Sequence, residues 1–314
     1  GSMDRIYIVG LKKDGTMIEH IQCAGNSSPE EMKNLEWIDT MEVDGYTNLV
    51  GKTKDGKLLT YGLEYFRMED YANLSDRGIV NVSEIVDIVG MDTVFMSDGR
   101  LFYCGHFSDG FNNSTFAQNV KQALDIGPMM AGLFAVLTEN GNVEFKVIVD
   151  DNNLTSEYLA WIESAEEWSD VVQIEGTDYT LFGLHEDGSV SMTDRGVIGD
   201  GFAKIECNEY ASGTLNELIG IRKDGTADVI LSTDASEAYG RTQITTWDNL
   251  KDISLGESHV VGLKNDGTVI AAGSNHIGQC DVEEWTDVIF LTTGENCTLG
   301  ITASGNLLMA GSLY

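Results

Sequence analysis

The sequence predicts an all-β fold built from one repeated hairpin unit, and three observations carry that prediction. The same pattern of apolar and turn residues recurs eight times, its period stays near 41 residues, and almost no segment has the apolar spacing of a helix. In each copy two apolar runs flank a polar-Gly dipeptide, as in IVGLKKDGTMI and VVGLKNDGTVI. Asp-Gly or Asn-Gly between alternating apolar runs favours a tight turn, because glycine accepts positive φ. We therefore expect one β-hairpin in each unit.

Two glycines at fixed positions mark most units. The turn glycines are Gly15, Gly56, Gly99, Gly141, Gly188, Gly225, Gly267 and Gly305. In six units another glycine precedes the turn glycine by five positions, and these are Gly10, Gly51, Gly183, Gly220, Gly262 and Gly300. Glycine inside a strand weakens that strand, so we expect another backbone or strand to pack closely against these positions.

A further apolar segment precedes seven of the hairpins, as in WIDTMEVD and LKDISLGE. Three strands in about 41 residues leave room for one more short strand, which predicts the four-stranded antiparallel blade of a β-propeller. Counting hairpins gives eight blades, whereas counting the preceding strands gives seven. We favour seven blades, with the N-terminal hairpin completing the last one, and keep eight as the alternative.

The repeat extends over nearly the whole chain, so residues 3–314 are predicted to form a single propeller domain. Gly1 and Ser2 precede Met3 and are typical of residues left by cloning. Three irregular segments, residues 64–80, 107–119 and 150–165, are predicted to be loops. None of the segments resembles a linker between domains.

Charge is the most unusual bulk property of the chain. It has 51 acidic and 19 basic side chains and a formal net charge of -32. Such a surface repels phosphate backbones and anionic lipid, so we expect no nucleic-acid binding. We also find no apolar run long enough to span a membrane. The acidity favours solubility, and it would also attract a basic partner.

The chain shows no set of residues typical of catalysis or of a cofactor site. Its five histidines, His20, His106, His185, His259 and His276, fall in five different units. No nucleophile elbow, phosphate-binding loop or metalloprotease motif occurs. The five cysteines have no C-x-x-C pair, and their odd number does not suggest a zinc site or a complete set of disulfides. We therefore expect no cofactor, no metal and no enzymatic activity, although an enzyme with a site in the central channel stays an alternative.

One segment carries a specific family resemblance. Residues 260–285 read VVGLKNDGTVIAAGSNHIGQCDVEEW. The informative features are His259, Gly262-Leu263-Lys264, Asp266-Gly267-Thr268, Ala272-Gly273, the loop from Asn275 to Gly278-Gln279, and Trp285-x-Asp287; Trp37-x-Asp39 and Trp168-x-Asp170 repeat the last feature. The segment resembles the regulator of chromosome condensation repeat, in the short form common in bacterial proteins. A WD-repeat propeller is less similar, because its tryptophan and aspartate are adjacent.

The resemblance implies a propeller that binds other proteins. Members of that family include nucleotide-exchange factors for small GTPases and a secreted inhibitor of β-lactamase, and both activities are alternatives here. Neither activity can be assigned to particular residues of this chain.

A propeller gathers equivalent loops on one face, so the loops after the third strand segments should lie together. Six of these seven loops contain an acid and three pair it with tyrosine. We predict a partner-binding face made of Asp44, Tyr46, Asp92, Met129, Asp178, Tyr179, Glu209, Tyr210, Glu257 and Glu295. Acids steer a cationic partner and tyrosine offers contact area at low entropic cost.

These observations predict a non-catalytic propeller, expected to be a monomer, that binds a protein or peptide through this face. We favour a bacterial cytoplasmic protein, with a secreted protein or effector as the alternative if a leader has been removed.

Overall fold

The computed structural model describes residues 6–11, 17–22, 37–43, 48–53, 58–61, 85–89, 93–103, 115–126, 133–147, 156–177, 180–208, 217–232 and 240–312. The chain divides into two compact units, residues 1–125 and 126–314. The first unit contains β1 (Ile6–Leu11), β2 (Met17–Gln22), β3 (Trp37–Val43), β4 (Asn48–Thr53), β5 (Leu58–Tyr61), β6 (Ile85–Val89), β7 (Thr93–Met96), β8 (Leu101–Tyr103), β9 (Thr115–Ala117) and β10 (Val120–Asp125).

The second unit holds the remaining elements. They are β11 (Leu133–Thr138), β12 (Val143–Val147), α3 (Ser156–Glu166), β13 (Val171–Thr177), β14 (Thr180–His185), β15 (Val190–Met192), β16 (Gly196–Gly199), β17 (Phe202–Cys207), β18 (Leu218–Arg222), β19 (Ala227–Leu231), η3 (Arg241–Thr246), β20 (Leu250–Leu255), β21 (His259–Lys264), β22 (Val269–Gly273), β23 (Val288–Thr293), β24 (Cys297–Thr302) and β25 (Leu307–Gly311).

Each sheet is an antiparallel meander of strands that are consecutive in the sequence. The first unit contains the sheets β1-β2, β3-β4-β5 and β6-β7-β8-β9. The second unit contains the pair β11-β12 and the sheets β13-β14-β15-β16, β17-β18-β19, β20-β21-β22 and β23-β24-β25. The predicted all-β class and the predicted hairpins are therefore confirmed, and β-propeller blades have this meander order. Four strands are described in β6-β7-β8-β9 and β13-β14-β15-β16, and three in the other sheets of the second unit, so a fourth strand in every blade stays a prediction.

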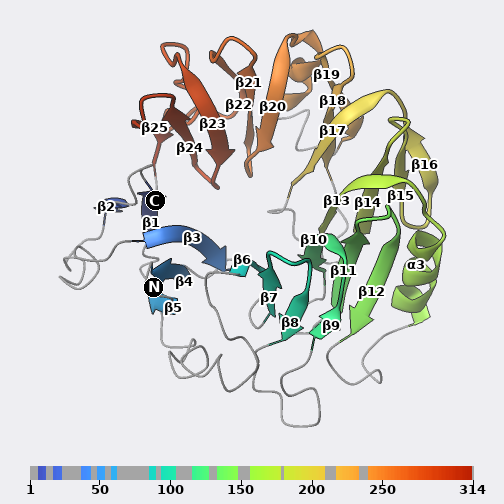
Figure 1. The fold of residues 1–314 in the computed structure, drawn as a ribbon. Helices are drawn as coiled ribbons and strands as arrows, with labels where there is room; N and C mark the ends of the chain where they lie inside the picture. Colours follow the sequence, from blue (N-terminus) through green and yellow to red (C-terminus); the bar gives the residue numbers. More distant parts are fainter. Residues whose placement is uncertain are drawn as a thin grey trace. The chain divides into compact units, whose positions relative to one another are not determined.

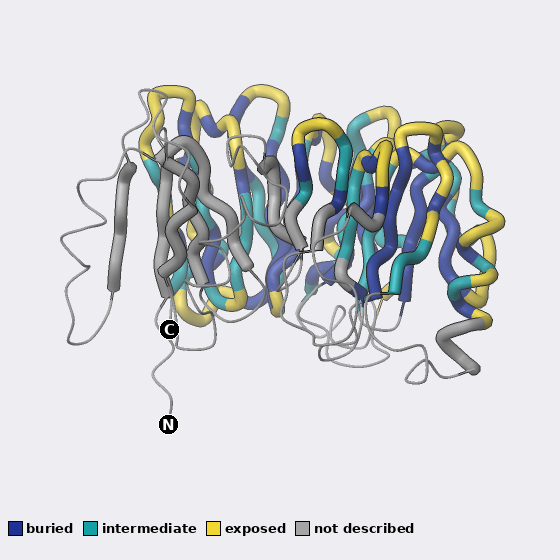
Figure 2. Tube along the Cα trace, turned by 60° about the horizontal axis from the view of Figure 1, so that its bottom comes forward, coloured by how far each residue is buried: buried dark blue, intermediate teal, exposed yellow. Residues whose placement is uncertain are grey.

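The core of the second unit lies between consecutive sheets, which Figure 1 shows side by side from green to red. Buried Ile219 and Ile221 of β18 cluster with Ile253 of β20 and Val260 of β21. In the second unit the first strands β13 and β20 are only partly buried, whereas the second strands β14 and β21 are buried along almost their whole length. Figure 2 shows the same pattern, with buried residues inside the strands and exposed residues at the turns. Burial on both faces explains why the second strands are almost continuously apolar.

The turn glycines join each sheet to the next. Gly267 has φ 82°, and its carbonyl accepts a hydrogen bond from the N–H of Val288, the first residue of β23, at 3.0 Å. Equivalent bonds join Gly141 to Val171, Gly188 to Phe202 and Gly225 to Leu250, all between 2.9 and 3.0 Å. The hairpin turn is therefore also the contact between consecutive sheets. The meander order places the described hairpin turns of the second unit at the end where the first strands begin.

The last residue of the Trp-x-Asp element, or Asn in its place, directly precedes the first strand of a sheet. Asp170, Asn249 and Asp287 have φ between 56° and 58°, a conformation that Asp and Asn tolerate better than most residues. The carbonyl of Asp287 accepts the N–H of Ala303 in the hairpin of its own sheet at 2.8 Å. The element therefore sets the backbone turn that leads the chain into β13, β20 and β23.

Tryptophans of this element lie against the second glycine of several units in the second half of the chain. A Cβ on Gly300 would lie 2.9 Å from Cζ3 of Trp285, and one on Gly183 would lie 2.7 Å from Cε3 of Trp168. The expected close approach is therefore confirmed: an indole ring makes it at Gly183 and Gly300, and the Phe202 ring and the Lys204 carbonyl make it at Gly220. Trp37 is not an equivalent residue. Trp37 is the first residue of β3 and pairs with Thr53. The equivalent residue of β13 is Val171, which pairs with His185 and follows Trp168 by three positions.

Two of the predicted loops contain regular structure. Residues 156–166 form α3, where the prediction of a loop over 150–165 was wrong. Trp161 and Ala165, one helical turn apart, are both buried, and the Trp161 ring lies 5.9 Å from the Phe145 ring of β12. Strand β9 lies within 107–119 and is the fourth strand of its sheet. The segment 64–80 lies outside the described residues.

Candidate functional site

The structure describes two of the ten residues predicted for the binding face, Glu257 and Glu295. Both side chains are exposed, at equivalent positions in the turns between the first and second strands of adjacent sheets. These turns lie at the end of the sheets opposite the hairpin turns, as the meander order requires. Asp44, Tyr46, Asp92, Met129, Asp178, Tyr179, Glu209 and Tyr210 lie outside the described residues.

The two turns have the same construction, and we call them the paired turns, residues 256–259 and 294–297. The N–H of Gly256 donates to the carbonyl of His259, and the N–H of Gly294 donates to the carbonyl of Cys297, both at 2.9 Å. The turns contact each other, because a Cβ on Gly256 would lie 2.8 Å from the Gly294 carbonyl oxygen. Glycine at this position therefore lets the two turns approach and brings two exposed glutamates onto one surface.

A buried hydrogen-bonded chain lies beneath the paired turns. Nε2 of His259 lies 3.0 Å from Oγ1 of Thr298, which donates to the Gln279 carbonyl at 2.7 Å. His259 and Thr298 are fully buried and Gln279 is almost so. The Thr298 hydroxyl has one proton, which it gives to Gln279, so Nε2 of His259 is the donor toward Thr298. These bonds join the two sheets beneath the two glutamates.

Burial keeps His259 neutral. It lowers the pKa of His259 to about 4; the nearby positive charge of Arg241 lowers the pKa further, and a backbone hydrogen bond to Cys297 opposes the shift. The neutral ring fits its place against the backbone of Gly256, where a Cβ would lie 2.7 Å from Nδ1. His259 is therefore a structural residue beneath the turns.

A buried ion pair holds the turn that carries Glu257. Nη2 of Arg241 lies 2.6 Å from Oε2 of Glu217, and both side chains are almost fully buried. Nη1 of Arg241 donates to the carbonyls of Gly256 and Glu257 at 3.0 and 2.8 Å. One guanidinium thus binds a carboxylate and two carbonyls, a use that suits its fixed fork of donors.

The sequence contained a signal for Arg241 that the repeat analysis missed. Arg241 precedes Leu250, the first residue of β20, by nine positions, and Gln279 precedes Val288, the first residue of β23, by the same number. Each of the two residues follows a glycine, Gly240 or Gly278. Both glycines have positive φ, 73° and 85°, and both following side chains are almost fully buried. Arginine at a glutamine position predicts a buried charge, and a buried charge requires a partner such as Glu217.

The described histidines and acids do not form a catalytic or metal-binding arrangement. His185 binds the Ser169 carbonyl and the Ser191 hydroxyl, both at 2.8 Å, and His276 lies 2.8 Å from the Ser274 hydroxyl. Within the described ranges no three His, Cys, Asp or Glu side chains are placed to hold a metal ion. Thr298 and His259 touch, but both are fully buried and a substrate could not reach them.

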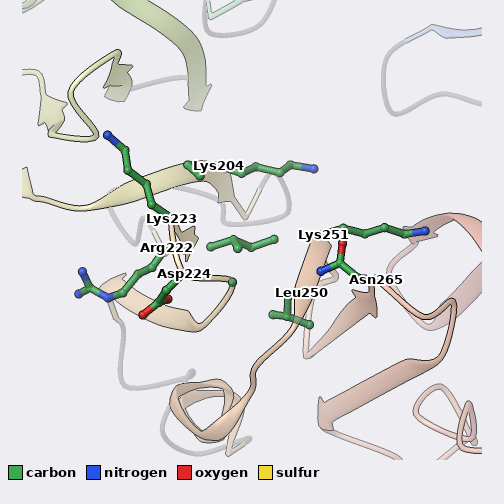
Figure 3. A pocket seen from close by; sticks show the side chains of 10 residues that line it. Lys204, Arg222, Lys223, Asp224, Leu250, Lys251 and Asn265 are labelled. Atoms are coloured by element: carbon green, nitrogen blue, oxygen red, sulfur yellow. The ribbon is translucent and has the colours of Figure 1, made fainter.

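A depression of about 340 Å³ lies between the sheets β17-β18-β19 and β20-β21-β22, near their hairpin turns (Figure 3). Lys204, Arg222, Lys223 and Lys251 line it, which is notable in so acidic a chain. Lys204 pairs with Asp252 and Arg222 with Asp228, and Nζ of Lys223 donates to the Asp187 carbonyl at 2.5 Å. Figure 3 shows that the charged ends of these side chains do not converge. The depression therefore lacks the arrangement of a small-anion site.

Comparisons with known proteins identify one repeat. Residues 250–279 match the family model of the regulator of chromosome condensation (RCC1) repeat. No curated protein sequence matches the chain. No helix in the described part of the chain is long and apolar enough to cross a membrane.

Several solved structures are similar to this chain at low sequence identity. Prp20p from Saccharomyces cerevisiae, reported with its binding to Gsp1p and histones, is 11% identical over 90% of this chain and 73% of its own, with a TM-score of 0.44. Human WBSCR16 is 13% identical over 99% of this chain and 89% of its own, with a TM-score of 0.46. BamB from Moraxella catarrhalis is 13% identical over 88% and 82%, with a TM-score of 0.42.

The matched segment contains β20, β21, β22 and the loop that ends at Gln279. It overlaps the residues on which the resemblance was based, from His259 to Gln279. The chain therefore carries a regulator of chromosome condensation repeat at residues 250–279, as the sequence predicted.

Proposed function

We propose that this chain is a non-catalytic β-propeller that binds a basic protein or peptide through the turns between its first and second strands. Seven blades remain our preferred number and eight the alternative, with residues 3–314 as one monomeric domain. The paired turns are the described part of the binding face. Asp44, Tyr46, Asp92, Met129, Asp178, Tyr179, Glu209 and Tyr210 are proposed to extend it.

The observation that supports this proposal most strongly is the rigid support under two exposed acids. Glu257 is exposed, while the carbonyl of the same residue is held by the buried Arg241. The turn of Glu295 is joined to it through His259 and Thr298. A partner that binds such a surface orders few groups, so less of the interaction energy is lost to entropy.

Charge supports the choice of partner. A chain with net charge -32 attracts a cationic surface over distance and increases the rate of encounter. The described basic residues near the paired turns include Arg241, whose charge is buried and neutralised by Glu217. The two exposed glutamates therefore act without a compensating cation in their own turns.

Affinity capture followed by a binding measurement tests the proposal. A protein captured at low salt would be purified and its Kd measured with wild type and with a Glu257→Lys, Glu295→Lys variant. The matched control is Glu139→Lys, Glu186→Lys, which makes the same charge change at hairpin turns on the opposite end of the sheets. We expect the first variant to weaken binding about tenfold or more and the control to change it much less. Equal losses in both variants would show that net charge, and not this face, is responsible.

Regulation of a small GTPase is a more specific form of protein binding that the RCC1 repeat supports. Release of a fluorescent guanine nucleotide from candidate GTPases, measured with and without this chain, tests it. Acceleration that is lost in the Glu257→Lys, Glu295→Lys variant would place that activity on the same face. If nucleotide release is not accelerated, the proposal reduces to protein binding without nucleotide-exchange activity.

A further inference from the structure

The basic side chains of the second unit are unevenly distributed. Four of them line the depression between the sheets β17-β18-β19 and β20-β21-β22, both of which belong to that unit. Only ten residues line the depression, so an even distribution would rarely place four there. Such a concentration in a chain of net charge -32 favours an anionic ligand. The lysines and arginines of residues 126–314 are Lys146, Arg195, Lys204, Arg222, Lys223, Arg241, Lys251 and Lys264.

Two of the four cations are neutralised within the chain and two are not. Lys204 and Arg222 each form an ion pair with an aspartate. Nζ of Lys223 donates to the backbone carbonyl of Asp187, a group without formal charge. In the part of the chain that the structure describes, no carboxylate forms an ion pair with Lys223 or Lys251, and both side chains are exposed. Their charges are therefore available to a ligand.

The surface between these cations is apolar. Ile221 and Leu250 line the depression, and each is only 4% exposed. Ala203 adds an exposed methyl group, and it lies at a β-bulge near the start of β17. Lys251 lies at the equivalent bulge of β20. A bulge changes the direction of a side chain, so Ala203 and Lys251 both border the depression.

The charged ends of the lining residues are spread over two sides. Figure 3 shows the ammonium ends of Lys204 and Lys251 pointing to one side, and the ends of Arg222 and Lys223 pointing to the other. A single phosphate or carboxylate would reach one side only. A ligand with several separate carboxylates fits this arrangement better, because each can bind its own cation.

Acids around the depression limit the length of such a ligand. Asp187 is exposed on the hairpin turn between β14 and β15, and Asp266 is exposed on the turn between β21 and β22. Asp224 lines the depression, but its carboxylate accepts the N–H and the hydroxyl of Thr226 at 3.0 and 2.6 Å. A nucleic acid has a phosphate at every nucleotide and would continue onto the neighbouring acids. A short peptide would end before them.

We propose that this depression binds a short acidic segment of a protein, with an apolar residue between its acids. The apolar side chain would contact Ile221 and Leu250, and carboxylates on its two sides would bind Lys223 and Lys251. The depression lies near the hairpin turns, at the end of the sheets opposite the paired turns. The inference therefore goes beyond the proposed function and does not depend on it.

Charge reversal at the two unpaired lysines tests the inference. The test variant is Lys223→Glu, Lys251→Glu, and the matched control is Lys146→Glu, Arg195→Glu, which makes the same charge change outside the depression. The probe is a fluorescent, C-terminally amidated peptide of sequence Glu-Asp-Leu-Asp-Glu. Its comparisons are Gln-Asn-Leu-Asn-Gln and a single-stranded oligonucleotide. Fluorescence anisotropy gives the Kd at physiological ionic strength, where a Debye length of about 8 Å reduces repulsion by distant acids.

We expect wild type to bind the acidic peptide and to bind both comparison ligands more weakly. The test variant should weaken binding of the acidic peptide about tenfold or more, because two attractive contacts become repulsive, and the control should change it by less than about threefold. Thermal melting checks that each variant is folded, and Lys223→Gln, Lys251→Gln should give an intermediate loss. Absence of binding, equal binding of the neutral peptide, tighter binding of the oligonucleotide, or unchanged affinity of the folded test variant would overturn the inference.

Chemical coupling locates the bound peptide. A carbodiimide joins a peptide carboxylate to an adjacent lysine as an amide and takes up the water as a urea. We expect peptide mapping to find the label on Lys223 or Lys251, and a label only on other lysines would overturn the inference. Glu257→Lys, Glu295→Lys should bind the acidic peptide at least as well as wild type. Failure of the paired turns to bind a basic partner and failure of this depression to bind an acidic peptide are therefore separate results.

Discussion

The carbonyl of Gly267 accepts a hydrogen bond from the N–H of Val288 at 3.0 Å, so a glycine in one hairpin turn determines where the next sheet begins. Val288 follows Asp287, which has φ 56°, and a Cβ on Gly267 would lie 3.2 Å from the Asp287 Cα. The conformation of the hairpin turn, the contact between the two sheets and the start of β23 therefore depend on the same few residues. Its repetition along the second unit gives the candidate binding face a regular support.

Replacing Gly267 with alanine should destabilise the protein by about 2 to 3 kcal/mol, because alanine is strained at φ 82° and its Cβ presses against the next sheet. Gly305→Ala is the matched control, with φ 83° and no atom within 4 Å of the added Cβ. It should cost about 1 kcal/mol, which is the backbone strain alone. Urea unfolding of both variants measures the difference, and equal losses would mean that the contact between sheets is not sensitive to this glycine.

Removing one member of the buried ion pair should be more damaging than removing both. Arg241→Met leaves the Glu217 carboxylate buried without its cation and should lower the free energy of unfolding by about 3 to 5 kcal/mol. Arg241→Met with Glu217→Leu should recover much of that loss, because no buried charge remains. Thermal or urea unfolding of the single and double variants provides the test. A double variant that is no more stable than Arg241→Met would contradict this interpretation of the pair.

The same double variant separates stability from binding. The carbonyls of Gly256 and Glu257 lose their donors when Arg241 is replaced, so the turn becomes less ordered even where the fold is stable. We expect the folded double variant to bind the partner more weakly than wild type, with Glu257 itself unchanged. Calorimetry of the partner with both proteins measures this, and an unchanged Kd would show that the rigidity of the turn does not contribute to affinity.

His259 should make stability depend on pH in mildly acidic solution. Its pKa is about 4 in the folded protein and near 6.5 when unfolded, so the unfolded chain takes up the proton first. The stability that neutral His259 provides is therefore complete above pH 6.5 and is lost as the pH falls toward 4, by up to about 3 kcal/mol. Urea unfolding of wild type and His259→Gln over this pH range isolates the contribution of His259 to stability. Parallel pH profiles for the two proteins would argue against a depressed pKa for His259.

Trp161 tests the helix that the sequence analysis missed. Its side chain is buried between α3 and β12, and Phe145 lies 5.9 Å away, centroid to centroid. Trp161→Ala should cost about 3 to 5 kcal/mol, as for other buried aromatic residues, whereas Glu163→Ala on the exposed side of α3 should cost little. A small effect at Trp161 would mean that α3 is not packed as described.

Local signals predicted the hairpins well because the turn chemistry determines them. Each described turn glycine has the positive φ that Asp-Gly and Asn-Gly imply, and Trp168 and Trp285 precede the strands as the repeat suggested. Helix α3 was missed because the search followed period-two patterns, which do not detect a single short helix. Packing against β12, rather than local preference, supplies its buried face.

The candidate site was less accessible to sequence reasoning. Glu257 and Glu295 could be found from their loop positions, since one acid recurs at the same place in adjacent units. Arg241 and Glu217 pair across 24 positions and two elements, and the sequence shows only that arginine stands where the next unit has Gln279.

The association rate of the captured partner as a function of ionic strength tests the central claim most directly. If exposed acids on the paired turns steer a basic partner, the rate for wild type should fall steeply with added salt, because screening shortens the range of attraction. The Glu257→Lys, Glu295→Lys variant should start lower and fall less, and the Glu139→Lys, Glu186→Lys control should remain close to wild type. An association rate that is independent of salt, or that falls equally in both variants, would contradict the account.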